Sequence, residues 1–162
     1  MTPAVMFEKL YSTGLFSDIN LHFAEFVAGR CGGKPEVFIA AAFVSRASSG
    51  GHICIDLEDF DPSESGVTEI LSPACRDARL WGELLVESGA AAEPGDFAPL
   101  VLEKPSRLYL FRYWQYEKDL AERIFSRARQ PEGTNGLTVR PAVLAGFRRS
   151  QIFSEPDWQR VA

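Results

Sequence analysis

The sequence predicts an α+β fold that is predominantly helical, with about five helices and a small antiparallel sheet of two or three short strands. Three observations lead to this class. Apolar residues recur at helical spacing in several segments that begin at proline or a capping residue and end at glycine. Residues 52–57 alternate between two faces as a strand does. Two apolar runs, residues 100–102 and 108–110, are separated by a short connection that contains proline, as in a hairpin.

The first third of the chain is expected to form three helices. Residues 4–12 are amphipathic, and Gly14 ends that pattern. Ser17 and Asp18 supply capping oxygens for a second helix, which ends in the glycine-rich run 29–33. Pro35 suits the first turn of a third helix that continues through Val44. The apolar stripe expected along the second helix consists of Ile19, Phe23, Phe26 and Val27.

The rest of the pattern is expected to combine strands and helices. In the strand 52–57, Ile53, Ile55 and Leu57 should face one way, and His52, Cys54 and Asp56 the other. A fourth helix should open at residues 72–73 and end at Gly89, followed by a linker of small residues, 90–96. Residues 113–127 return to helical spacing after the hairpin. We expect the first strand to join the hairpin in one sheet, because a two-stranded hairpin alone is marginal in water.

Charge is distributed unevenly along the chain. Residues 1–100 hold 6 Lys/Arg and 15 Asp/Glu, whereas residues 101–162 hold 11 Lys/Arg and 7 Asp/Glu. The acidic first part is a poor surface for nucleic acid, and the basic second part could meet DNA or an acidic partner. Three cysteines far apart in sequence favour a reduced, cytoplasmic setting over a disulfide framework. No run of apolar residues is long enough for a membrane span, and no export leader is expected.

The sequence predicts no catalytic residue and no metal site. The tempting Gly32-Gly33-Lys34 is followed by Pro35 instead of the hydroxyl residue that a phosphate-binding loop requires, so a turn between helices is expected. His52, Cys54 and Asp56 share a strand face, but the outer two are too far apart to bind one metal ion without a bend. A thiol site at Cys54 beside His52 would lack an orienting third group.

An aromatic segment interleaved with arginine is the strongest local signal. It comprises residues 107–114, with Tyr116 continuing the aromatic cluster just beyond, and its candidate interface residues are Arg107, Tyr109, Phe111, Arg112, Tyr113 and Trp114. Three interpretations stay open: aromatic core at a strand-to-helix junction, a protein interface, and a platform that stacks single-stranded DNA bases. They can coexist, because alternate residues of a strand face opposite sides.

Several segments, in order and spacing, resemble one known family. They are Phe38-Ile39-Ala40-Ala41-Ala42-Phe43-Val44-Ser45, Gly51-His52-Ile53-Cys54-Ile55-Asp56-Leu57, Pro99-Leu100-Val101-Leu102, and the segment 107–114 with Glu117 beyond it. The last eleven residues, with Asp157-Trp158-Gln159, read as the opening of a further helix. Together they resemble the N-terminal region of the alpha subunit of exodeoxyribonuclease V, the RecD family.

The resemblance implies a division of labour within a larger protein. The parent would be the ATP-driven, 5′-to-3′ helicase subunit of a helicase-nuclease that processes double-strand DNA ends in recombinational repair. It would use ATP and Mg²⁺, and Gln159 would contact the adenine base. Residues 1–129 would be a non-catalytic docking domain without a cofactor, 130–156 a linker with a short helix, and 157–162 the start of the ATPase domain. The expected partners are the beta and gamma subunits, chiefly gamma, with DNA reached through the parent complex and no membrane contact.

A DNA-binding module of the winged-helix type is the alternative. Helices followed by a hairpin are compatible with it, and its contacts would come from basic residues of the second part of the chain. These are Arg107, Arg112, Arg123, Arg127, Arg148 and Arg149.

Overall fold

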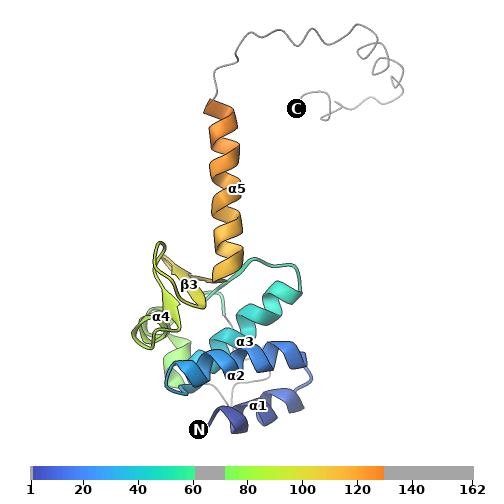
Figure 1. The fold of residues 1–162 in the computed structure, drawn as a ribbon. Coiled ribbons are helices and arrows are strands. Elements are labelled where there is room, and N and C mark those ends of the chain that lie inside the picture. The colour runs from blue at the N-terminus through green and yellow to red at the C-terminus, as the bar shows by residue number, and fades with distance from the viewer. Residues whose placement is uncertain (1, 61–71, 130–162) are drawn as a thin grey trace, which may run out of the picture. The chain divides into compact units, whose positions relative to one another are not determined.

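A computed structural model describes residues 2–60 and 72–129 of the chain (Figure 1). In order, the elements are α1 (Pro3–Ser12), α2 (Asp18–Arg30), α3 (Pro35–Ser49), β1 (Cys54–Asp56), a 3₁₀ turn (Pro73–Arg76), α4 (Ala78–Glu87), β2 (Ala91–Ala92), β3 (Leu100–Glu103), β4 (Arg107–Leu110) and α5 (Phe111–Arg129). Five α-helices and one small sheet among the described residues confirm the predicted class.

The chain divides into two compact units, Met1–Arg123 and Ile124–Ala162. In the second unit the structure describes only residues 124–129, which are the end of α5. The predicted division at residues 130–156 and 157–162 falls outside the described residues and stays a prediction.

Helix α3 is the centre of the first unit. Every residue from 37 to 44 is buried, which is the pattern of a helix surrounded on all sides. Helices α1 and α2 lie against it in one layer, and α4 and the sheet lie beside it (Figure 1). Small side chains at Ala40, Ala41 and Ala42 let these neighbours approach closely.

The turn between α2 and α3 is the glycine pair that resembles part of a phosphate loop. Gly32 and Gly33 both adopt left-handed conformations, with φ of 79° and 68°. Such angles are natural for glycine at a helix end. The pair therefore forms the turn predicted from the sequence, with Pro35 in the first turn of α3.

The predicted apolar stripe of α2 is half right, because Val27 is buried and Phe23 packs against the core, but the other two residues are not. Ile19 and Phe26 are 72% and 59% exposed, whereas the buried residues of this helix are Asn20, Leu21, Ala24, Val27 and Ala28. The helix turns its small residues toward α3, where close packing requires them, and it turns Asn20 inward as well. Only Val27 of the predicted stripe is fully buried.

Asn20 is the centre of a polar network that joins α2 to α3. Its amide nitrogen donates to the hydroxyls of Ser45 at 3.0 Å and Ser49 at 3.2 Å. Its carbonyl oxygen accepts from the backbone N–H of Ser17 at 3.1 Å and from the Ser17 hydroxyl at 2.7 Å. The side chain is thus fully used at 2% exposure, which explains how an amide is tolerated in the core.

We expect Asn20→Ala to lower the free energy of unfolding by about 1–3 kcal/mol, because the partners of its buried amide in Ser17, Ser45 and Ser49 lose their hydrogen bonds. Chemical denaturation monitored by circular dichroism measures the change. Ser12→Ala is the matched control, since the Ser12 hydroxyl bonds only the Lys9 carbonyl of its own exposed helix end, and its effect should stay within about 0.5 kcal/mol. Equal losses in the two variants would contradict a structural role for the network.

The sheet has the strand order β1-β4-β3-β2. Strands β3 and β4 form the predicted hairpin, and β1 pairs with β4 antiparallel, with Cys54 opposite Tyr109. This confirms that the first strand joins the hairpin, although the strand is shorter than the predicted 52–57. Ile55 and Leu57 reach the main core as predicted, but Ile53 is 46% exposed.

The segment 90–96, predicted to be a linker, contains a strand. Ala91 and Ala92 pair with Leu100 and Val101 in parallel, which the sequence pattern did not indicate. The predicted helix start at residues 72–73 is also corrected: Pro73–Arg76 is a separate 3₁₀ turn, and α4 begins at Ala78 with Asp77 as its cap. The cap forms because the Asp77 carboxylate accepts from the Leu80 N–H at 3.0 Å.

Asp56 ties β1 to the turn that precedes β4. Ser106 donates to its carboxylate, and the backbone N–H of Leu57 donates to the Ser106 carbonyl at 3.0 Å. The Ser106 hydroxyl, followed by the backbone N–H of Glu58, lowers the pKa of Asp56. The stabilisation from this contact is therefore present at neutral pH and is lost as the pH falls through the lowered pKa.

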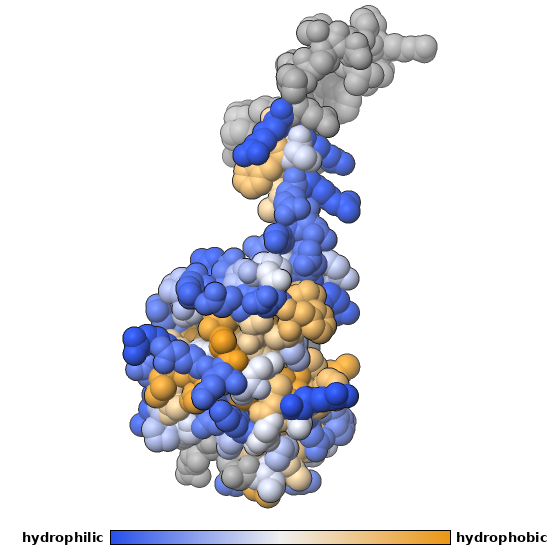
Figure 2. All heavy atoms as spheres, turned by 60° about the vertical axis from the view of Figure 1, so that its left-hand side comes forward, coloured by the Kyte–Doolittle hydropathy of each residue, from blue (hydrophilic) through white to orange (hydrophobic). Residues whose placement is uncertain are grey.

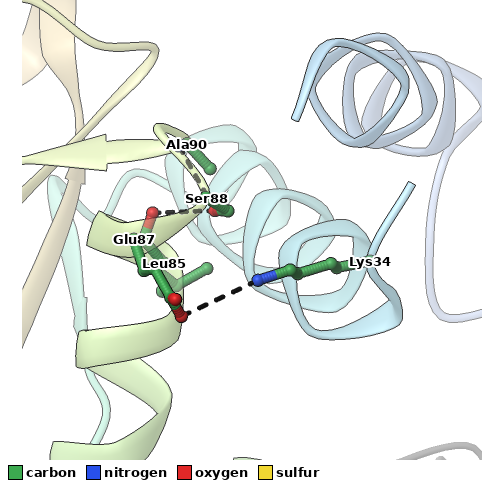
Figure 3. Close-up of polar contacts among 5 residues, drawn as sticks. All are labelled: Lys34, Leu85, Glu87, Ser88 and Ala90. Carbon is green, nitrogen blue, oxygen red and sulfur yellow. Dashed lines mark hydrogen bonds and ion pairs between the residues drawn. The ribbon is translucent and has the colours of Figure 1, made fainter. Parts of the chain in front are cut away.

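The end of α4 lies next to the start of α3 (Figure 3). Lys34 and Glu87 form an ion pair at 3.9 Å, and the Ser88 hydroxyl donates to the Leu85 carbonyl at 2.8 Å. The Lys34 and Glu87 side chains are 40% and 74% exposed, so the ion pair is open to solvent and contributes about 0–1 kcal/mol. The main tether between these helices is instead the buried Trp81, whose Nε1 donates to the Glu36 carbonyl at 3.1 Å.

Candidate interaction site

The aromatic segment 107–114 consists of β4 and the first turn of α5. Along β4 the side chains alternate as the pleat requires: Leu108 is buried in the main core, and Tyr109 faces the other side. Arg107 is exposed at the start of the strand. The structure thus separates residues that the sequence placed in one group.

A second, smaller hydrophobic cluster lies where α5 begins. Its buried members are Val101, Tyr109 and Trp114, with Cys54 and Phe111 partly buried against them. Tyr109 is 2% exposed and Trp114 is 7% exposed. These two candidate interface residues are therefore core residues of the first unit, and little of either surface is open to a partner while Lys118 lies over the Trp114 indole.

The Tyr109 hydroxyl is held by a carboxylate. It donates to Glu103 at 3.1 Å across the hairpin. Burial, then the neighbouring Cys54 and Glu103, raise the pKa of Tyr109, so the phenol stays protonated at any physiological pH. Its role is that of a hydrogen-bond donor within the cluster.

The accessible part of the segment combines arginines with aromatic faces. Arg112 is exposed and lies 5.1 Å from the Tyr113 ring centroid, with a 3.4 Å contact from Nη2 to the Tyr113 hydroxyl. Phe111 is half-buried and meets Phe97 edge-on at 5.0 Å. Arginine beside aromatic surface is a combination enriched at protein interfaces.

Exposed hydrophobic residues extend the candidate site beyond the predicted segment. Phe97 is 85% exposed, and Tyr116 and Leu120 on α5 are 59% and 58% exposed. Figure 2 brings forward the side of the first unit that carries the sheet and α4, where hydrophobic residues gather among charged ones. Phe97 was not among the predicted site residues, although an aromatic residue between Gly95 and Pro99 is a usable signal, because packing seldom requires one in a turn.

Three other kinds of site were considered in the sequence: a metal site, a membrane span and a nucleotide contact. Within residues 2–60 and 72–129, no group of three His, Cys, Asp or Glu side chains could hold a metal ion. The helices of the same described parts include none long and apolar enough to cross a membrane. Gln159 lies outside the described residues, so its predicted nucleotide contact stays a prediction.

The remaining thiol hypothesis concerns Cys54. Its side chain is half-buried against the second cluster, while His52 is exposed just before the strand. Cys75 is buried, and desolvation raises its pKa to about 11, which keeps it an unreactive thiol. Cys75 therefore lacks the exposed, electropositive surroundings that activate a nucleophilic cysteine.

Comparison with known families decides where the chain belongs. Residues 12–109, more than half of the sequence, match the family described as the N-terminal domain of the RecBCD enzyme subunit RecD. The chain belongs to the RecD family. The match runs from the last residue of α1 to Tyr109 in β4, so it covers the helices α2, α3 and α4 and nearly all of the sheet. Comparison with curated proteins found no match.

The RecD match also divides the candidate site. Arg107 and Tyr109 lie within the matched residues, whereas the start of α5 with Arg112 and Trp114 follows it. Residues 152–162, which contributed to the sequence resemblance, lie outside the match.

Proposed function

We propose that this chain is the docking domain through which a RecD subunit assembles with the beta and gamma subunits of exodeoxyribonuclease V, chiefly gamma. The observation that carries the proposal is the family match over residues 12–109. Exposed hydrophobic and arginine side chains within and just after the matched residues supply a surface suited to a protein partner. In this proposal residues 1–129 are non-catalytic and position the helicase motor of the parent protein.

The parent protein would supply the chemistry that this domain lacks. ATP and Mg²⁺ would bind a motor domain beyond the docking domain, with Gln159 at its start. DNA would reach the assembly through the parent complex. The complex would unwind and degrade double-strand ends for recombinational repair.

Capture of this chain by immobilised gamma or beta subunit tests the proposal. We expect stable capture by gamma, reduced about tenfold in the double variant Arg107→Glu/Arg112→Glu, because both guanidinium groups are exposed and charge reversal opposes complementary docking. Arg79→Glu is the matched control, since Arg79 is also exposed but lies on α4, and it should leave capture unchanged.

Each alternative predicts a different result, either in this capture experiment or in a DNA-binding experiment with the same variants. Capture by neither subunit would contradict docking. Capture that resists reversal of both arginines would place the interface outside the segment 107–114. Salt-dependent binding of the isolated chain to a DNA end, lost in the double variant, would favour the winged-helix alternative.

A further inference from the structure

An open pocket of about 370 Å³ lies beside the start of α5, within the first unit. It is formed where the loop after β2 and the end of β3 meet one face of the helix. Its lining residues are Pro94, Glu103, Trp114, Glu117, Lys118 and Ala121. The lining therefore combines an indole, two carboxylates and one ammonium group.

The indole of Trp114 already holds a cation. The Lys118 ammonium lies 5.0 Å from the ring centroid, within the range of a cation–π interaction. Lys118 follows Trp114 by one helical turn, so its own helix delivers it to this position. The pocket is thus built to receive positive charge over an aromatic face.

The carboxylates of the pocket remain available to a cation. Among the ion pairs of the described residues, none joins Lys118 to Glu103 or Glu117. Glu103 accepts one hydrogen bond, from the Tyr109 hydroxyl, and lies opposite Arg107 in the strand register, where the two opposite charges attract each other without a direct ion pair. The nearby Lys104 is engaged elsewhere, because its ammonium lies 2.8 Å from Glu93.

We propose that this pocket binds the guanidinium group of an arginine side chain presented by a partner protein. A guanidinium group is planar, stacks on an indole, and directs several N–H donors to carboxylates at the same time. Of these interactions, Lys118 makes only the contact over the indole ring. An incoming arginine displaces Lys118 from the indole and adds hydrogen bonds to Glu103 and Glu117.

This inference deepens the proposed docking function and takes the existence of a protein partner from it. The probe is N-acetyl-arginine amide, added to the full chain, with N-acetyl-citrulline amide as the neutral control of the same shape. The readout is the indole N–H resonance of Trp114, assigned with Trp114→Phe. We expect a saturable shift with the arginine compound and none with the citrulline compound.

Two pairs of variants make the test specific. Lys118→Ala removes the competing cation and should tighten binding about two- to fivefold, the worth of one exposed cation–π contact. Lys104→Ala changes the net charge equally outside the pocket and should leave binding unchanged. Glu117→Gln should weaken binding by a similar factor, and Glu122→Gln, on the same helix but outside the lining, should not.

The results separate this inference from the docking proposal. Absence of a saturable shift in both the original chain and Lys118→Ala, or an equal shift with the citrulline compound, would overturn the arginine pocket. So would equal gains in Lys118→Ala and Lys104→Ala, which would indicate a general charge effect. Arginine binding without capture by gamma or beta would contradict the docking proposal alone, and capture without arginine binding would overturn the pocket alone.

Discussion

Trp81→Ala is expected to lower the free energy of unfolding by about 3–5 kcal/mol, the range found for removing a buried aromatic side chain. Trp81 has no exposed surface and contacts Phe60 edge-on at 5.2 Å. Its Nε1 also donates to the Glu36 carbonyl, which would lose that donor. The change therefore creates a cavity between α4 and α3 and removes a buried hydrogen bond at once.

Chemical denaturation of the full chain, followed by circular dichroism, measures this loss. Leu80→Ala is the matched control on the same helix, because Leu80 is 44% exposed, and it should cost less than about 1 kcal/mol. Trp81→Phe keeps most of the ring but not the N–H, so an intermediate loss of about 1–2 kcal/mol is expected. A Trp81→Ala loss no larger than that of Leu80→Ala would contradict the central place of this residue.

The position of Trp81 also illustrates what the sequence could predict. The helix that carries it was predicted from helical spacing in a segment with a clear stop at Gly89, and Trp81 and Leu85, one turn apart, are buried on it. The hairpin and the start of α3 were likewise predictable, because proline and short connections fix local geometry without reference to the rest of the fold. Local signals were sufficient for these elements, although they misplaced the start of α4, which the local Asp77 cap fixes.

Elements that depend on distant partners were not predictable in this way. Asn20 is buried because Ser45 and Ser49 face it from α3, 25 and 29 residues away, and no spacing rule within α2 contains that information. The strand Ala91–Ala92 exists because β3 offers it a parallel edge. Alanine pairs carry almost no strand preference of their own, so the sequence favoured a linker there.

In the candidate site, too, local sequence features were predictable and contacts between distant segments were not. Composition alone identified the segment 107–114, because arginine among aromatics is visible in a sequence. Which of its members are buried depends on the alternation of β4 and on how α5 covers Val101. The arginine pocket could not be predicted, because Pro94, Glu103 and Glu117 meet only after the hairpin and the helix have packed.

Trp114→Ala is the second change with a large expected effect, again a loss of about 3–5 kcal/mol. Trp114 is 7% exposed and packs with Tyr109 and Val101 in the cluster that joins the start of α5 to the sheet. That cluster is small, so one residue provides a large share of its buried surface. Denaturation of the full chain measures the loss, and circular dichroism should show that the remaining core keeps the fold at low temperature.

Trp114→Phe is the variant that separates packing from recognition. It retains an aromatic ring against Tyr109, so we expect most of the stability to return. Capture by the gamma subunit should then return too if Trp114 acts mainly through packing, since the indole itself is almost covered. A stable Trp114→Phe variant that still fails to be captured would assign the indole a direct contact with the partner.

If Trp114→Ala changed neither stability nor capture, both the core interpretation and the interface interpretation of this residue would be wrong.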